Sequence, residues 1–155
     1  METSLDSVRS SIRSAFAGVS LGNGVGLWEA QAIDDHEPDK VRQAARARDV
    51  KDDWTSLPTA DLAECESSLS FFDAPGMRFH VPAFMLAELD GHLGQGSTVF
   101  SLTSVYDDYG LEQMSGLSPD QRAAVREFLT VMMEHEDYDF ERASIERAIK
   151  EYWAG

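Results

Sequence analysis

The chain has 155 residues and a single cysteine, Cys65, so it forms neither an intrachain disulfide nor a cysteine-rich zinc site. Its 28 acidic and 13 basic residues give a net charge of −15, which disfavours nucleic acid and anionic membranes and favours a basic partner. Neither a signal peptide nor an apolar run of roughly 20 residues is apparent, so we expect a cytoplasmic protein. This length suits one globular domain over residues 1–155.

The spacing of apolar residues predicts a mainly α-helical fold of about five or six helices. Apolar residues recur every three or four positions from Leu5 to Val19, as in an amphipathic helix. Glycines then interrupt the pattern from Gly22 to Gly26. Further short helices are predicted over residues 27–33, from Pro38 onward and over residues 59–65.

Two segments in the middle of the chain suggest a small two-stranded β element. Residues 77–81 follow a Pro-Gly turn and precede Pro82, which suits the first turn of a helix running to Leu89. Residues 98–106 alternate weakly between apolar and polar side chains, as in an edge strand. We therefore expect one strand in each segment.

The last third of the chain carries the clearest helix signals. Ser118, Pro119 and Gln121 supply an N-cap, a proline at the first helical position and a capping-box partner. The apolar stripe that follows predicts a helix reaching about Glu134. A final helix is expected to open near Asp139.

No complete catalytic or metal-binding motif is present. The glycine run from Gly22 to Gly26 lacks both the third glycine of a dinucleotide fingerprint and the Gly-Lys-Ser/Thr of a phosphate loop. The four histidines form no metal-binding pair, and acidic neighbours make Cys65 a poor nucleophile. We therefore predict no catalytic residue, no metal and no cofactor.

The stretch from residue 71 to residue 85 is the most unusual part of the sequence. It holds four of the eight phenylalanines, and its Arg78 is the only Lys or Arg between Lys51 and Arg122. An enclosed guanidinium needs a partner, so Arg78 is expected to bridge a carboxylate, Asp73 or Glu29, and to pin the adjacent turn.

A functional interpretation of the same block stays open. Arg78 would then anchor a carboxylate or phosphate ligand in an aromatic-walled cleft. His80 lies between Phe79 and Val81 and is predicted to be buried. Because a lone buried histidine is more often a hydrogen-bonded core residue than a catalyst, the structural interpretation is favoured.

The glycine run, a tryptophan and the Arg78 block together resemble a family of small bacterial proteins of unknown function. The matching stretches are residues 24–30 with 33–34, Trp54, residues 70–85 and residues 117–121. The resemblance implies no activity or ligand. It implies that the glycine loop, Glu29, Trp54 and the Arg78 block pack together as one unit. Family members more often carry an aromatic where His80 stands, so histidine chemistry there would not be a family property.

Two functional hypotheses follow, and the first is a non-enzymatic interaction module. Residues 52–112 carry eleven acidic residues and one basic residue, a local net charge of −10. Such a surface would steer a basic partner, as in an immunity-type inhibitor that caps a basic toxin or nuclease. The expected contact residues are exposed acids, namely Asp52, Asp53, Asp107, Asp108, Glu134, Glu136, Asp137 and Asp139.

The alternative hypothesis is a small ligand-binding domain or enzyme built around a cleft. Its residues would be Glu29, Arg78 and His80, with Trp54 and Asp73 as further anchors. The aromatic excess of the central block has a third interpretation, in which it forms the face of a homodimer.

Overall fold

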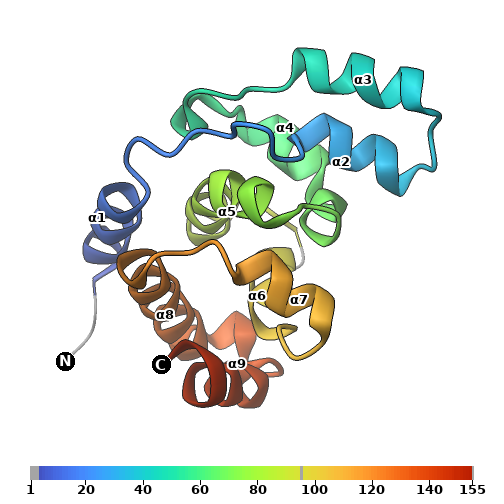
Figure 1. Ribbon diagram of the computed structural model, residues 1–155. Coiled ribbons are helices and arrows are strands. Elements are labelled where there is room, and N and C mark those ends of the chain that lie inside the picture. The colour runs from blue at the N-terminus through green and yellow to red at the C-terminus, as the bar shows by residue number, and fades with distance from the viewer. Residues whose placement is uncertain (1–3, 95, 155) are drawn as a thin grey trace.

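The computed structural model describes residues 4–94 and 96–154, and these residues form helices and loops without a strand (Figure 1). The α-helices of this part of the chain are α1 (Leu5–Ala15), α2 (Leu27–Asp34), α3 (Asp39–Arg48), α4 (Thr59–Glu64), α5 (Ala74–Leu89), α6 (Ser97–Thr103), α7 (Asp108–Met114), α8 (Pro119–Glu134) and α9 (Arg142–Ala148). The prediction of a mainly α-helical chain is confirmed. The predictions of five or six helices and of a two-stranded β element are wrong.

Helix α5 occupies the centre of the arrangement. It packs against α1, α4, α6 and α7. Figure 1 shows α2, α3 and α4 on one side of α5, and α6 to α9 on the other. Short helical segments complete the described chain: the 3-10 helices η1 (Trp54–Ser56), η2 (Glu66–Ser70) and η3 (Glu136–Tyr138), and the π-helical turn η4 (Ile149–Trp153).

The sequence of α5 explains its central position. Asp73 caps the helix, since its Oδ1 accepts a hydrogen bond from the Gly76 amide at 2.9 Å. Eleven of the sixteen helical residues are buried, as expected for a helix that is apolar on all sides. Pro82 lies inside this helix, so the predicted strand over residues 77–81 and the predicted helix start at Pro82 are wrong. A short apolar run reads alike as a buried strand or a buried helix, which explains the error.

The second predicted strand, over residues 98–106, is also replaced by a helix. Helix α6 buries Val99 and Leu102, which are three positions apart and lie on one helical face. The weak alternation of this segment therefore comes from a short amphipathic helix and the loop that follows it.

The two ends of the chain meet in the same core. Helix α1 packs on α8, and the buried Val8, Ile12 and Phe16 belong to one apolar cluster with Phe128 and Trp153. Helix α8 begins with the predicted capping box, in which the Ser118 amide donates to the Gln121 side chain at 3.0 Å and the Gln121 amide donates to the Ser118 hydroxyl at 3.2 Å.

Candidate functional site

The glycine loop before α2 is held by a buried carboxylate from the chain that follows α3. Asp49 accepts hydrogen bonds from the amides of Trp28 at 2.7 Å and Glu29 at 3.1 Å, which are the free amides at the start of α2. Burial is the main reason that the pKa of Asp49 is raised. A Cβ added at Gly26 would lie 2.0 Å from the Asp49 carboxylate, so only glycine fits there.

The same loop is also tied to the start of α5. Asp73 accepts a second hydrogen bond from the Val25 amide at 2.9 Å, and a Cβ at Gly24 would lie 2.8 Å from the Gly76 amide. Arg46 of α3 donates to the backbone of the loop and pairs with Glu29 at 3.1 Å. The glycine loop and the start of the Arg78 block therefore pack together, as the resemblance implies.

Arg78, His80 and Glu29 have different surroundings in the fold. Arg78 is half-buried and makes no ion pair with any described residue, so the expected bridge to Asp73 or Glu29 is not formed. Both carboxylates are engaged elsewhere, Asp73 as a helix cap and Glu29 by Arg46. None of the hollows described below is lined by Arg78, His80 or Glu29.

His80 is a core residue. Its side chain is fully buried, and its ring stacks on Phe72 with the centroids 4.3 Å apart. Its Nδ1 lies 2.7 Å from the Gly76 carbonyl, so Nδ1 carries the proton and Nε2 is left buried without a partner. Burial lowers the pKa of His80 to about 4, so the imidazole is neutral near pH 7.

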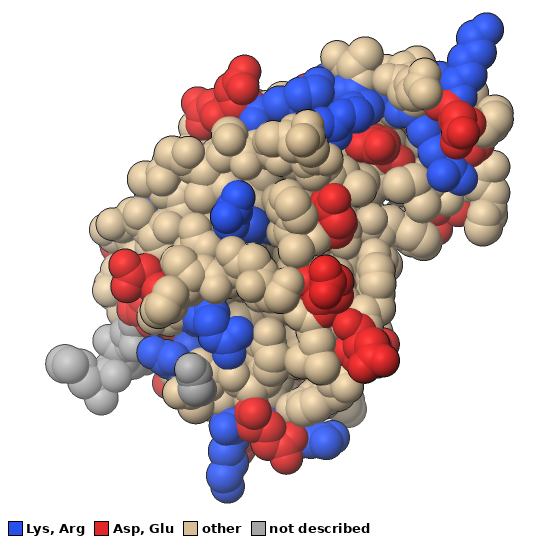
Figure 2. Space-filling view, viewed as in Figure 1, with Lys and Arg blue, Asp and Glu red and all other residues tan. Residues whose placement is uncertain are grey.

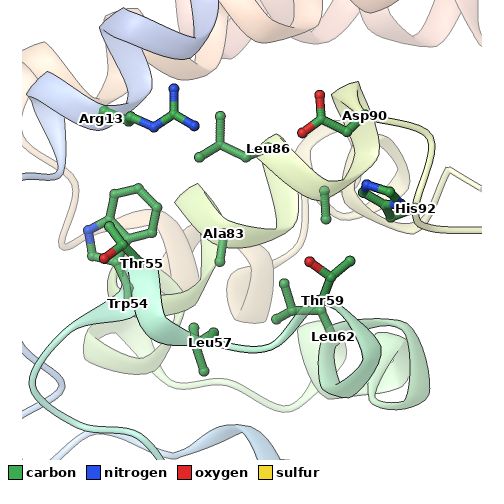
Figure 3. A pocket seen from close by; sticks show the side chains of 11 residues that line it. Arg13, Trp54, Thr55, Leu57, Thr59, Leu62, Ala83, Leu86, Asp90 and His92 are labelled. Carbon is green, nitrogen blue, oxygen red and sulfur yellow. The ribbon is translucent and has the colours of Figure 1, made fainter.

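Trp54 lines a hollow of about 200 Å³ between α1, η1, α4 and α5 (Figure 3). The Trp54 indole donates its Nε1–H to the Phe16 carbonyl at 2.8 Å and therefore offers only apolar surface to this hollow. The floor is apolar, with Leu57, Leu62, Ala83, Leu86 and Ala87. The rim is polar, with Arg13, Thr55, Thr59, Asp90 and His92.

A second concave surface lies over η2, α6 and α7, and we call it the aromatic groove. It consists of two adjoining hollows of about 390 and 140 Å³ that share Leu69, Ser70, Phe100 and Ser101. Phe100 is 68% exposed, and Tyr109 is 51% exposed while its hydroxyl donates to the Phe72 carbonyl at 3.2 Å. Surface exposure of this kind, at a concave site, is typical of a contact region.

Carboxylates stand at the two ends of the aromatic groove. Glu66 lines one hollow and accepts a hydrogen bond from the Ser97 hydroxyl at 2.7 Å. Asp107 lines the other and caps α7, accepting from the Gly110 amide at 2.6 Å. In Figure 2, acidic side chains lie along the right edge of the molecule, over α7. Basic side chains gather over α3 at the top of the same view.

The predicted acidic surface is divided among three parts of the fold. Its members precede η1 (Asp52 and Asp53), lie at the start of α7 (Asp107 and Asp108), end α8 (Glu134) or follow it (Glu136, Asp137 and Asp139). Some have structural roles, because Asp53 caps η1 and Asp139 pairs with Arg142. The turn after α8 also carries Phe140, which is 99% exposed.

Phe100, Tyr109 and Glu66 were not among the site residues expected from the sequence. The signal that would have found the first two is the presence of aromatic residues on the polar side of short amphipathic helices, beside Asp107 and Asp108. Because residues 98–106 were expected to form an edge strand, the exposed helical face that carries Phe100 was not anticipated.

The described residues offer little for metal or thiol chemistry. Among residues 4–94 and 96–154, no group of three or more His, Cys, Asp or Glu side chains lies close enough to hold a metal ion. Burial, followed by the charge of Glu64, raises the pKa of Cys65 to about 12, so the thiol is not a nucleophile near neutral pH. None of the helices in the described part of the chain is long and apolar enough to cross a bilayer.

Comparison with known proteins places the chain in a family. No curated protein and no solved structure matches it. A family model does, and it covers nearly the whole chain. Since residues 4–155 match the model of a family of unknown function (DUF6714), the chain belongs to that family.

Proposed function

We propose that this protein is a non-enzymatic interaction module that binds a basic segment of a partner protein in the aromatic groove. The observation that carries the proposal is the placement of two exposed aromatic side chains, Phe100 and Tyr109, between the carboxylates of Glu66 and Asp107. Lysine and arginine side chains bind both kinds of group, by cation–π contact and by ion pairing.

The charge of the surrounding chain supports a basic partner. The groove is built from residues 66–113, within the span 52–112 that has a net charge of −10, plus the neutral Gln113. The single basic residue of this span, Arg78, does not line the groove. Like-signed carboxylates around a concave surface attract cations and raise their association rate.

The frame of the groove is built from specific contacts. The buried Gln113 amide donates to the carbonyls of Leu69 and Phe72, both at 2.9 Å, and so joins α7 to the chain before α5. A rigid frame reduces the entropy lost when a partner binds. Tyr109 of α7 therefore stands on a supported backbone although its ring is exposed.

An immunity-type inhibitor of a basic toxin or nuclease is the specific form of this proposal. A stable complex buries about 1,200–2,000 Å² in total, which is more than the groove alone supplies. The remaining acidic residues, such as Asp108, would then form the charged rim around the aromatic centre, as at other protein interfaces.

The test uses a defined probe, an N-acetylated and C-amidated Leu-Arg-Leu-Arg peptide, titrated into ¹⁵N-labelled protein. We expect amide shift changes to centre on Phe100 and Tyr109, and binding to weaken severalfold from about 0.05 M to about 0.3 M salt. A Leu-Glu-Leu-Glu peptide should not bind. Phe100→Ala should weaken binding about two- to fivefold, since the exposed ring contributes about 0.5–1 kcal/mol of cation–π energy to ΔG of binding.

Phe140→Ala is the matched control, because Phe140 is an equally large exposed ring beside acidic residues on the turn before α9. This variant should bind the basic peptide as the unchanged protein does. If Phe140→Ala weakens binding and Phe100→Ala does not, the contact surface is the acidic turn and the groove proposal is wrong. Equal binding of the acidic peptide would also overturn it.

A further inference from the structure

The hollow in Figure 3 has a chemistry opposite to that of the aromatic groove. Its floor is made of aliphatic side chains and the indole of Trp54, while Arg13 extends from α1 at its rim. Arg13 is exposed and makes no hydrogen bond or ion pair with any described residue. One turn earlier, Arg9 pairs with Asp6 at 3.2 Å and donates to Asp90 at 3.1 Å.

Arg13 pairs with none of the described acidic side chains, although the chain has 28 acidic residues. The carboxylate across the hollow, Asp90, is already paired with Arg9, which it shares with Asp6. The other polar groups at the rim, the Thr59 hydroxyl and the His92 ring, supply hydrogen-bonding groups and no negative charge. The mouth of this hollow therefore has one guanidinium available for an anion.

The dimensions limit the ligand to a small molecule. At about 30 Å³ for each liquid water molecule, 200 Å³ corresponds to about seven waters, or a ligand of about five to nine non-hydrogen atoms. Pockets that enclose drug-sized ligands have volumes of about 300–1,000 Å³, so this hollow is too small to enclose one. An apolar floor favours a hydrocarbon body and disfavours a phosphate, whose several charged oxygens would lose water there.

We propose that this hollow binds a short aliphatic carboxylate, with its hydrocarbon body on the floor and its carboxylate paired with Arg13. The planar guanidinium pairs with a carboxylate through two parallel hydrogen bonds, which a single ammonium group does not reproduce. The half-buried side chain of Leu86 and the small exposed part of Trp54, which is 3% exposed, contact the hydrocarbon. This hollow shares no lining residue with the aromatic groove. The carboxylate site and the basic-partner site can therefore be tested independently.

The experiment is a titration of ¹⁵N-labelled protein with sodium 4-methylpentanoate at constant ionic strength. We expect shift changes at the amides of Thr55, Leu62 and Ala87 and a Kd on the order of 1 mM, as befits a ligand of this size. Sodium acetate, which lacks the hydrocarbon body, and 4-methylpentylammonium chloride, which reverses the charge, should each bind at least about fivefold more weakly.

Arg13→Gln should weaken binding of 4-methylpentanoate about fivefold or more, because it removes the charge-assisted pair. This variant is expected to fold, since the Arg13 side chain is exposed. Lys40→Gln on α3 removes the same unit of charge away from the hollow and should leave binding unchanged. The proposal is overturned if Arg13→Gln binds equally well, if acetate binds as tightly, or if the shifts lie outside the lining residues.

Discussion

Replacing Gly26 with alanine should destabilise the protein through one contact. The backbone of Gly26 has φ −81° and ψ 172°, an extended conformation that alanine adopts without strain. The added Cβ would instead lie 2.0 Å from Oδ2 and 2.5 Å from Cγ of Asp49. The methyl group would therefore displace the carboxylate that caps α2.

The size of the effect follows from the hydrogen bonds of Asp49. It accepts from Trp28 and Glu29 while only 7% exposed, and hydrogen bonds to charged groups contribute about 1.5–3 kcal/mol each. A small shift of the Asp49 side chain or of the loop would preserve part of this hydrogen-bond energy. We expect Gly26→Ala to lower the free energy of unfolding by about 2–3 kcal/mol, and Asp49→Gly to lower it by about 3 kcal/mol.

A double-mutant cycle tests this reasoning, with unfolding in urea followed by far-UV circular dichroism. In the Asp49→Gly background the Asp49 side chain that the new methyl group would meet is absent. Gly26→Ala should then lower the free energy of unfolding by less than about 0.5 kcal/mol, because alanine also reduces the entropy of the unfolded chain. The expected coupling energy is about 2 kcal/mol. If the two costs add to within about 0.5 kcal/mol, the clash with Asp49 is not the cause and the argument fails.

Two further predictions concern buried titratable groups, each checked by urea unfolding as a function of pH. Burial raises the pKa of Glu88, so the native protein holds a proton that the unfolded chain releases above about pH 4.5, and stability falls as the pH rises through this window. Glu88→Gln should remove this loss of stability. If the free energy of unfolding changes with pH in the same way in this variant, Glu88 is not the group responsible. Burial lowers the pKa of His80 to about 4, so stability is lost as the pH falls from about 6.5 to 4, by on the order of 3 kcal/mol. His80→Phe should abolish that loss while preserving the stack on Phe72, and a persistent loss would point to another group.

The parts of the fold that could be predicted are those with local signals. The capping box at Ser118 and the amphipathic pattern of α1 identify their helices because both patterns depend on neighbouring residues alone. The central helix lacked such a signal, since its residues are apolar on every side and Pro82 interrupts it. The burial of His80 between apolar neighbours was expected and is found.

The partners of the charged residues could not be predicted, because they depend on contacts distant in sequence. Glu29 pairs with Arg46 and Asp49 caps α2 only because α2 and α3 pack side by side. Arg78 was the most conspicuous cation in the sequence, yet it pairs with no described carboxylate. The isolation of Arg78 from other basic residues in the sequence therefore did not indicate a role in ion pairing.

The acidic residues differ in what they do for the fold, and this difference decides which of them reveals function. Asp49, Asp73 and Asp107 accept backbone hydrogen bonds, so replacing them damages the framework whatever the protein binds. Asp108 is exposed at the start of α7 and accepts no side-chain hydrogen bond from a described residue. If the net charge of −15 served only solubility, Asp108→Asn and Glu66→Gln would leave the affinity for any basic probe unchanged. If these carboxylates instead form a charged rim around the aromatic groove, each substitution would weaken binding, because it removes a charge that attracts the bound cation.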